Sequence, residues 1–169
     1  MKDLKNWARE GAASDLMYLF CHARPARYDD TSDGESWLGF GLSESDDSSE
    51  ARAGIGELRG GQRPTNPVVI LNACSSAQQD LVYGAPFAEF FAGEWGAQAF
   101  IGTDWPVNSG FADVFGQRIL SMILKDQISL RDALRRASDE TAQDSNYLPL
   151  IYAVYGLSTV RFVDPHPAG

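Results

Sequence analysis

Three short apolar runs constrain the fold of this chain more than any other feature of its sequence. They are DLMYLF, PVVILNA and AQAFIGT, at residues 15–20, 67–73 and 97–103. None of them alternates strictly between apolar and polar residues, which is typical of strands that are covered on both faces. We therefore expect the runs to form strands of a sheet with helices packed on both sides.

The segments between and after these runs have helical spacing. Residues 85–96 repeat aromatic side chains at that spacing before Gly96, which is suited to end a helix. A second helix is expected after Asn108 or Ser109, and a third after Ser129, since all three are good N-cap residues.

The last part of the pattern, PLIYAVYGLSTVRFV at residues 149–163, nearly alternates Val and Tyr around Gly156. This predicts closing strands joined by a turn. The full order of strand, strand, helix, strand, helix, helix and strand predicts an α/β sandwich.

Composition and charge limit the class of protein. A chain of 169 residues with 44% hydrophobic and 22% charged residues is long enough for one soluble globular domain. A net charge of -9 argues against binding to nucleic acid or to anionic membranes, so any partner is expected to be a protein. No apolar run approaches the roughly 20 residues that span a bilayer. The start MKDLKNWARE also lacks the apolar core of a signal peptide, and we expect a cytoplasmic protein.

The chain has only two cysteines, Cys21 and Cys74. Two cysteines are too few for a disulfide framework, and they lack the spacing of a zinc site. We therefore expect free thiols, and neither a metal nor a cofactor. Along its strand, Cys21 alternates with His22, so its side chain is expected to face the core.

Three segments interrupt the regular pattern. Residues 43–50, SESDDSSE, predict a solvated acidic loop, and residues 59–67, RGGQRPTNP, predict a flexible connector. The end DPHPAG, residues 164–169, predicts a disordered tail, which makes His166 a poor catalytic candidate. A single domain is thus expected over residues 1–163.

Two of the apolar runs lead into a chemically reactive side chain. We expect Cys74 to end one of these strands and His22 to end another. The carboxyl ends of parallel strands are where catalytic residues collect, so neighbouring parallel strands would bring the thiol and the imidazole together. Such a Cys/His pair is a nucleophile with its base, and backbone N–H groups after Cys74 would stabilise the oxyanion. The inert interpretation stays open, because cysteine is often buried and a lone histidine at a strand end is usually structural.

Several segments, in the same order over nearly the whole chain, resemble a CHAT domain, the caspase-like cysteine peptidase family that is often attached to TPR repeats. DLMYLFCHA at residues 15–23 is similar to the family's histidine strand, and VVILNACSS at residues 68–76 is similar to its cysteine strand. Residues 91–120 resemble the family's Gly-Ala strand, its Gly-Thr-x-Trp-Pro-Val segment and the following helix. Residues 128–137 and 149–156 resemble its last helix and last strand.

This resemblance implies a caspase-hemoglobinase-like three-layer sandwich with a mostly parallel central sheet, as in the clan of caspases, separase and gingipains. It implies a cysteine endopeptidase in which His22 and Cys74 form the dyad and the backbone N–H groups of Ala23 and Cys74 form the oxyanion hole. The expected partners are a protein or peptide substrate and a TPR-containing or other regulatory protein.

The chain departs from the family pattern in two ways. Ala23 stands where the family usually has glycine, and only residues 1–14 precede the histidine strand. We therefore expect the domain to lack N-terminal strands, and to self-associate or to need additional sequence. The departures keep a second interpretation open, a catalytically silent CHAT-like interaction module. A flavodoxin-like nucleotide binder fits the element order but has no Gly-rich phosphate loop here.

Asp104 and Trp105 follow the third strand and are candidate substrate-binding residues. Asp104 is either a turn or capping residue, or a carboxylate that pairs with a basic substrate side chain and directs cleavage after Arg or Lys. Trp105 is either a packing anchor below the site or a wall of the substrate cleft.

Overall fold

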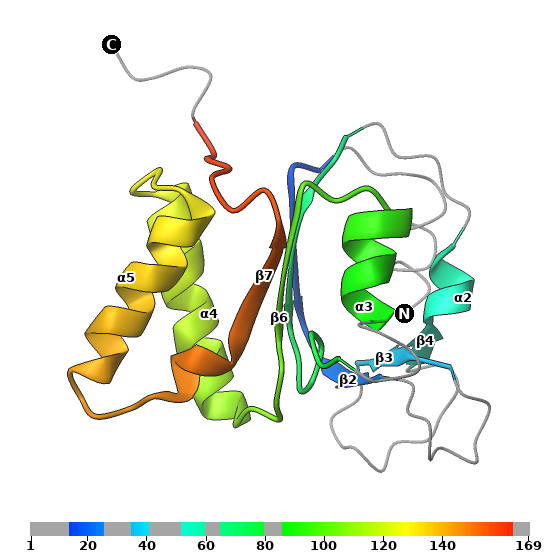
Figure 1. The fold of residues 1–169 in the computed structure, drawn as a ribbon, viewed down its shortest axis with the longest axis horizontal. Coiled ribbons are helices and arrows are strands. Elements are labelled where there is room, and N and C mark those ends of the chain that lie inside the picture. The colour runs from blue at the N-terminus through cyan, green and yellow to red at the C-terminus, as the bar shows by residue number, and fades with distance from the viewer. Residues whose placement is uncertain (1–13, 26–34, 41–51, 60–64, 80–85, 164–169) are drawn as a thin grey trace.

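A computed structural model describes residues 14–25, 35–40, 52–59, 65–79 and 86–163 of the protein (Figure 1). Its centre is a four-stranded sheet with the strand order β1-β5-β6-β7. The strands are β1 (Leu16–Phe20), β5 (Val68–Asn72), β6 (Ala99–Thr103) and β7 (Tyr152–Gly156).

The sheet is mostly parallel. β1 pairs with β5 in parallel from Leu16 opposite Val68 to Phe20 opposite Asn72. β5 pairs with β6 in parallel, and β7 runs antiparallel to β6. The two strands that lead toward His22 and Cys74 are therefore neighbours with the same direction, as the dyad requires.

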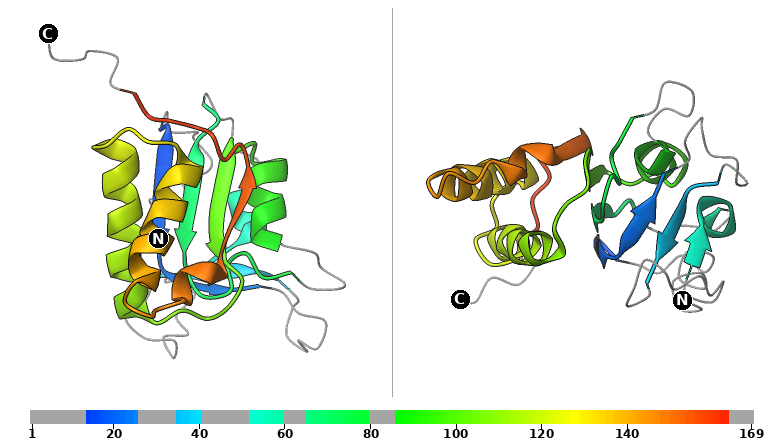
Figure 2. Two further views of the ribbon diagram at one scale, coloured as in Figure 1. Left: turned by 60° about the vertical axis from the view of Figure 1, so that its left-hand side comes forward. Right: turned by 90° about the horizontal axis from the view of Figure 1, so that it is seen from below.

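Helices cover both faces of this sheet (Figures 1 and 2). On one face lie α4 (Ser109–Leu124) and α5 (Leu130–Ala142). On the other lies α3 (Pro86–Ala88), which continues as the π-helix η2 (Glu89–Glu94). The architecture is thus the three-layer α/β sandwich that was predicted.

Alternate residues of the same strands supply the two halves of the core. Val68 and Ile70 of β5 belong to the cluster under α4 and α5, whereas Val69 and Leu71 belong to the cluster under α3. Every residue of β5 and β6 is buried. Burial on both faces explains why these runs show no alternation in the sequence.

A small antiparallel sheet continues the chain beyond β1. It has the order β2-β3-β4 and consists of β2 (His22–Arg24), β3 (Trp37–Gly39) and β4 (Arg52–Gly54). The short helix α2 (Ile55–Leu58) follows β4 directly. Figure 1 shows this sheet near one end of α3, on the side of the large sheet away from α4 and α5.

This second sheet corrects one expectation. We expected His22 to end the apolar strand, but that strand ends at Phe20, and the chain bends at Cys21. His22 instead begins β2, where it pairs with Gly39. The short-range pattern could not show this, because the partner strand β3 lies further along the chain.

The expected helix ends are confirmed. The side chain of Asn108 accepts hydrogen bonds from the N–H groups of Gly110 and Phe111 at the start of α4. The Ser129 hydroxyl accepts one from the N–H of Asp132 at the start of α5. Both are N-caps that satisfy N–H groups left without a partner in the first turn of a helix.

The expected closing strands are only partly present. A 3₁₀ helix, η3 (Leu148–Ile151), precedes β7, and residues 157–163 form no strand. The carbonyls of Ser158 and Val160 instead accept hydrogen bonds from Arg131 N at 2.8 Å and Leu130 N at 3.0 Å. The second strand was thus a wrong prediction, because these carbonyls bond to the first turn of α5.

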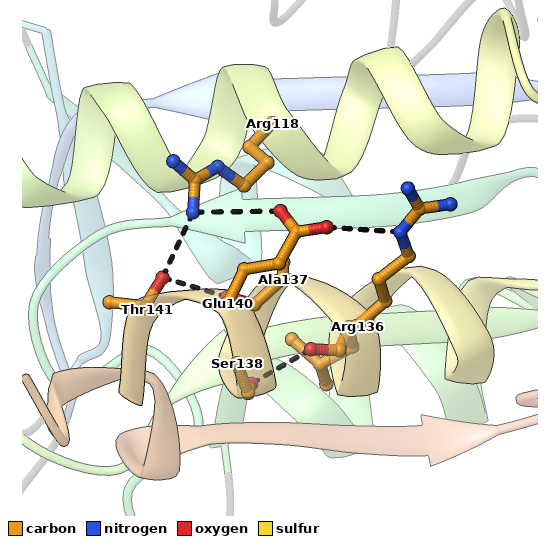
Figure 3. A network of polar contacts seen from close by, with 7 residues as sticks. Arg118, Arg136, Ala137, Ser138, Glu140 and Thr141 are labelled. Atoms are coloured by element: carbon orange, nitrogen blue, oxygen red, sulfur yellow. Dashed lines mark hydrogen bonds and ion pairs between the residues drawn. The ribbon is translucent and has the colours of Figure 1, made fainter. Parts of the chain in front are cut away.

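A polar network joins α4 to α5 (Figure 3). Arg118 Nη1 donates to Thr141 Oγ1 at 3.2 Å and lies 3.8 Å from Glu140 Oε2. Arg136 Nε donates to the other Glu140 oxygen at 3.0 Å. Pairs this exposed contribute less than about 1 kcal/mol each, so the network adds little to the stability of the helix pair.

None of the described helices is long and apolar enough to cross a membrane. The acidic segment 43–50, much of the predicted connector and the end 164–169 with His166 lie outside the described residues, so the expectations for them stay predictions.

Replacing Gly156 with alanine is expected to destabilise the protein more than replacing Gly96. Both glycines have positive φ, +86° and +73°, which costs a residue with a side chain about 1–2 kcal/mol. A Cβ at Gly96 meets nothing within 4 Å, whereas one at Gly156 would collide with the Gln98 carbonyl oxygen. Urea unfolding of the two variants measures the difference, and equal losses would show that the backbone around Gln98 can shift freely.

Candidate functional site

A pocket of about 410 Å³ opens beyond the carboxyl ends of β1 and β5. It lies between the end of the large sheet, the start of the small sheet and the first turn of α4. Its lining residues are Phe20, Cys21, His22, Phe40, Asn72, Ala73, Cys74, Val107, Ser109 and Ala112. The fold thus brings His22 and Cys74 into one pocket, although His22 lies in the small sheet and Cys74 in the turn after a strand of the large sheet.

Cys74 was expected to end its strand, but β5 ends at Asn72 and Cys74 lies in the tight turn that follows. Its neighbour Ser75 has a φ of 54°, and Ser76 N donates to Ala73 O at 3.3 Å as the chain reverses. The Cys74 side chain is half-buried, and its thiol donates to Val107 O at 3.4 Å. The turn therefore places the sulfur at the pocket wall rather than in the core.

Two buried hydroxyl groups attach this turn to β6. Ser76 Oγ donates to Leu71 O at 2.9 Å and accepts the N–H of Thr103 at 2.9 Å. Thr103 Oγ1 donates to Ala73 O at 2.6 Å, and Ala77 N donates to Thr103 O at 2.8 Å. Because these groups are buried, each lost bond would leave an unsatisfied polar atom. The position of Cys74 is consequently well constrained.

Asn72 forms the polar floor of the pocket and is almost fully buried. Its amide nitrogen donates to Tyr18 OH at 2.9 Å and to Ala112 O at 2.6 Å, and its oxygen accepts from Tyr152 OH at 2.7 Å. Burial raises the pKa of Tyr18 and of Tyr152, so both phenols stay neutral. A Cβ at Gly116 would collide with Tyr18 OH, which explains the glycine on this face of α4.

His22 reaches the pocket from the first position of β2. It is partly exposed and lies opposite Gly39, where an added Cβ would lie 3.7 Å from His22 Cβ and 2.8 Å from the Trp37 ring. Within the described residues no hydrogen bond joins His22 to Cys74. The structure therefore brings the predicted pair together at the pocket, and the dyad itself stays a prediction.

Cys21 packs against the apolar cluster under α3, as its alternation with His22 predicted. Burial raises its pKa to about 12, and the nearby Cys74 thiol adds to this rise. Cys21 is therefore a neutral thiol at physiological pH, although it also lies at the pocket wall.

The two predicted oxyanion groups lie near the same pocket. None of the described residues accepts a hydrogen bond from the N–H of Cys74. Ala23 lies opposite Leu38 in the β2–β3 pair, next to His22. Their role as an oxyanion hole stays a prediction.

Asp104 and Trp105 do not line the pocket as described. Asp104 N donates to Ile151 O at 2.8 Å, and partial burial raises the pKa of the Asp104 carboxyl. The Trp105 side chain is 66% exposed, so it is not a packing anchor below the site. Its carbonyl accepts the N–H of Ser75 at 3.4 Å and thereby supports the cysteine turn. A substrate role for either side chain stays a prediction.

Sequence reasoning missed most of the apolar wall of the pocket. Val107 and Ala112 belong to the entry into α4, and Phe40 directly follows β3. Asn72 carried a usable signal, since it is a polar residue at the end of an otherwise apolar strand. Phe40 carried none, because nothing local predicts where β3 lies.

Iodoacetamide at pH 7 is expected to label Cys74 at least about tenfold faster than Cys21, because only a thiolate reacts well and the half-buried Cys21, whose pKa is raised to about 12, stays protonated. Mass spectrometry of digested protein measures both rates. Equal or reversed labelling would contradict this assignment.

A Cys74→Ser variant provides the control. Its remaining thiol should react about tenfold faster for each pH unit between pH 8 and pH 10, since the thiolate fraction rises with pH below a pKa of about 12. A plateau near pH 9 would show that Cys21 is not buried as described.

Thr103→Val is expected to lower the free energy of unfolding by about 0.5–1.5 kcal/mol, because it removes the shorter of the two hydrogen bonds to the Ala73 carbonyl and leaves only the one from Ser76 N. Thr103→Ser retains the hydroxyl and should lose clearly less. Chemical denaturation compares the two, and a Val variant as stable as the Ser variant would show that this bond does not hold the turn.

The family model of the CHAT domain matches residues 2–159 of the 169-residue chain. No curated protein sequence matches the chain significantly. The matched range includes both strands that lead to the pocket and the helices on either side of the sheet. The chain therefore belongs to the CHAT domain family, which is related to the caspase-like peptidases.

Proposed function

We propose that this protein is a cysteine endopeptidase in which Cys74 is the nucleophile and His22 the general base and acid. The observation that carries the proposal is that both side chains line one pocket at the carboxyl ends of two parallel strands. A thiol and an imidazole that share a pocket form the minimal set of groups for acyl transfer by cysteine.

The reaction would proceed in two steps. The Cys74 sulfur attacks the carbonyl carbon of a peptide bond, and the thiol proton passes to the His22 imidazole. The imidazole then donates this proton to the leaving amine as the C–N bond breaks, which leaves a thioester. In the second step His22 accepts a proton from water as the water oxygen attacks the thioester carbonyl carbon. The C–S bond then breaks, the carboxylic acid leaves, and His22 returns the proton to the Cys74 sulfur.

The backbone around the nucleophile supports this chemistry. The N–H groups of Cys74 and Ala23 are the proposed donors to the oxyanion of the tetrahedral intermediate. Donors that are held in place before the reaction stabilise such charge most effectively. The bonds of Ser76 and Thr103 hold the Cys74 turn in this way.

The bond from Cys74 to Val107 has a consequence for the mechanism. In the structure the thiol donates to Val107 O at 3.4 Å. Proton transfer to His22 would require the thiol to turn away from this carbonyl. Thiols are weak donors, and catalytic hydrogen bonds often tighten only when substrate binds.

The same observation favours a second candidate function, a catalytically silent CHAT-like interaction module. Its thiol would stay on Val107 O, and Ala23 in place of the usual glycine would obstruct the approach of a substrate carbonyl. In either case the proposed partners are proteins: a protein or peptide substrate for the enzyme, and a TPR-containing or other regulatory protein for both. The net charge of -9 accords with protein partners rather than nucleic acid or membrane, and the proposed location is the cytoplasm.

Cys74→Ala and His22→Ala are each expected to abolish cleavage of a denatured protein substrate. The other described thiol of the pocket, Cys21, stays protonated, and no other described lining residue carries an imidazole. Removal of a group that acts together with another typically costs several orders of magnitude in kcat. Gel assays of cleavage measure this loss, and circular dichroism verifies that the variants are folded.

His166→Ala is the matched control, since His166 is the only other histidine and was predicted to lie in a tail. It should cleave as well as the wild type. Cleavage that survives in Cys74→Ala would exclude the mechanism, and a wild type that cleaves no substrate would favour the interaction module.

A further inference from the structure

The described residues that line the pocket beside Cys74 include few ionisable groups. None of its described lining residues is Asp, Glu, Lys or Arg, and its ionisable groups are His22 and the two thiols. Apolar side chains form much of the wall, from the end of β1, the segment after β3 and the entry into α4.

The polar groups of the floor are already engaged. Both amide hydrogens of Asn72 are donated, to Tyr18 and to Ala112, and its oxygen accepts from Tyr152. The floor therefore offers no free donor of its own to a ligand. A charged side chain entering the pocket would lose its water without gaining a counter-charge, which is unfavourable.

The walls lack apolar contacts that a ligand could supply. Phe20 and Phe40 remain 46% and 39% exposed, although both line the pocket. Burial of such rings against an apolar group is favourable, since the stabilisation grows with the apolar area removed from water. Val107, which is buried, lies at the same pocket.

We propose that this pocket binds a neutral, apolar side chain of the substrate, of the size of Leu or Met, on the residue that precedes the cleaved bond. The proposal rests on the proposed function. A volume of about 410 Å³ lies within the range of ordinary ligand pockets. The sequence favoured Arg or Lys through Asp104, but that residue does not line the pocket as described, so the apolar wall sets the preference.

Peptide aldehydes test the pocket without requiring turnover. The Cys74 thiol adds to the aldehyde carbonyl: an S–C bond forms, the C=O π bond breaks, and the thiol proton passes to the oxygen. Acetyl-Ala-Ala-leucinal, acetyl-Ala-Ala-argininal and acetyl-Ala-Ala-aspartal differ only in the side chain that would enter the pocket. The measured quantity is the concentration of each that protects Cys74 from iodoacetamide.

The leucinal peptide is expected to protect at a concentration at least about tenfold lower than the other two, the factor that a few apolar contacts provide. Stronger protection by the argininal or aspartal peptide would overturn the proposal and show that groups outside the described lining set the preference. Equal protection by all three, or protection by none, would overturn it as well.

A charge placed in the pocket provides a second arm. Ser109 lines the pocket and begins α4, where an acidic residue is favourable, so Ser109→Asp should fold. Ser109→Asn is the size-matched neutral control. The Asp variant should shift the ratio of argininal to leucinal protection toward argininal by about tenfold relative to the Asn variant, because a carboxylate can pair with the guanidinium. An unchanged ratio would show that the pocket does not hold this side chain.

Cleavage of peptides with Leu, Arg or Asp before the scissile bond separates this proposal from the proposed function. Protection by leucinal without cleavage of any peptide would mean that the pocket is assigned correctly and the endopeptidase proposal fails. Cleavage after Arg in preference to Leu would mean that the endopeptidase proposal holds and the pocket assignment fails.

Discussion

Parallel pairing of β1 with β5 is the interaction on which the rest of the site depends. It sets Phe20 opposite Asn72, so the two strands end side by side, and the chain continues from one toward His22 and from the other toward Cys74. Helices on both faces exclude water from this pairing, and burial of both faces makes its register hard to change. A shift by one residue would exchange the residues under α3 with those under α4 and α5. The register thus sets the core and the pocket together.

Buried hydroxyl and amide groups fix the ends of these strands. Ser76 and Thr103 connect the cysteine turn to β6, and Asn72 connects β5 to α4 and β7 through Ala112 and Tyr152. Such groups stabilise a fold only when every partner is present, because an unpaired buried polar atom is costly. They therefore specify one geometry at the end of the sheet. α4 contributes to both the pocket and the helix layer, since its first turn lines the pocket and Arg118 in a later turn contacts α5.

Local patterns predicted a large part of the fold. The buried runs became β1, β5 and β6, and Asn108 and Ser129 cap α4 and α5 as their residue types indicated. These features depend on neighbours within a few residues, and for that reason they are visible in the sequence. Local patterns wrongly predicted a strand at residues 157–163. The backbone there accepts hydrogen bonds from the first turn of α5, a segment far away in the sequence.

The sequence by itself determined the sandwich, the caps, and the two side chains that meet at the pocket. These follow from periodicity, from residue types suited to helix ends, and from reactive residues placed after apolar runs. Only the tertiary structure decided that His22 begins a second sheet, that Phe40 and Val107 form the walls, and that Asp104 lies outside the pocket. The physical reason is that a pocket is made by segments from separate elements. Their meeting depends on packing between those elements, and no local pattern encodes it.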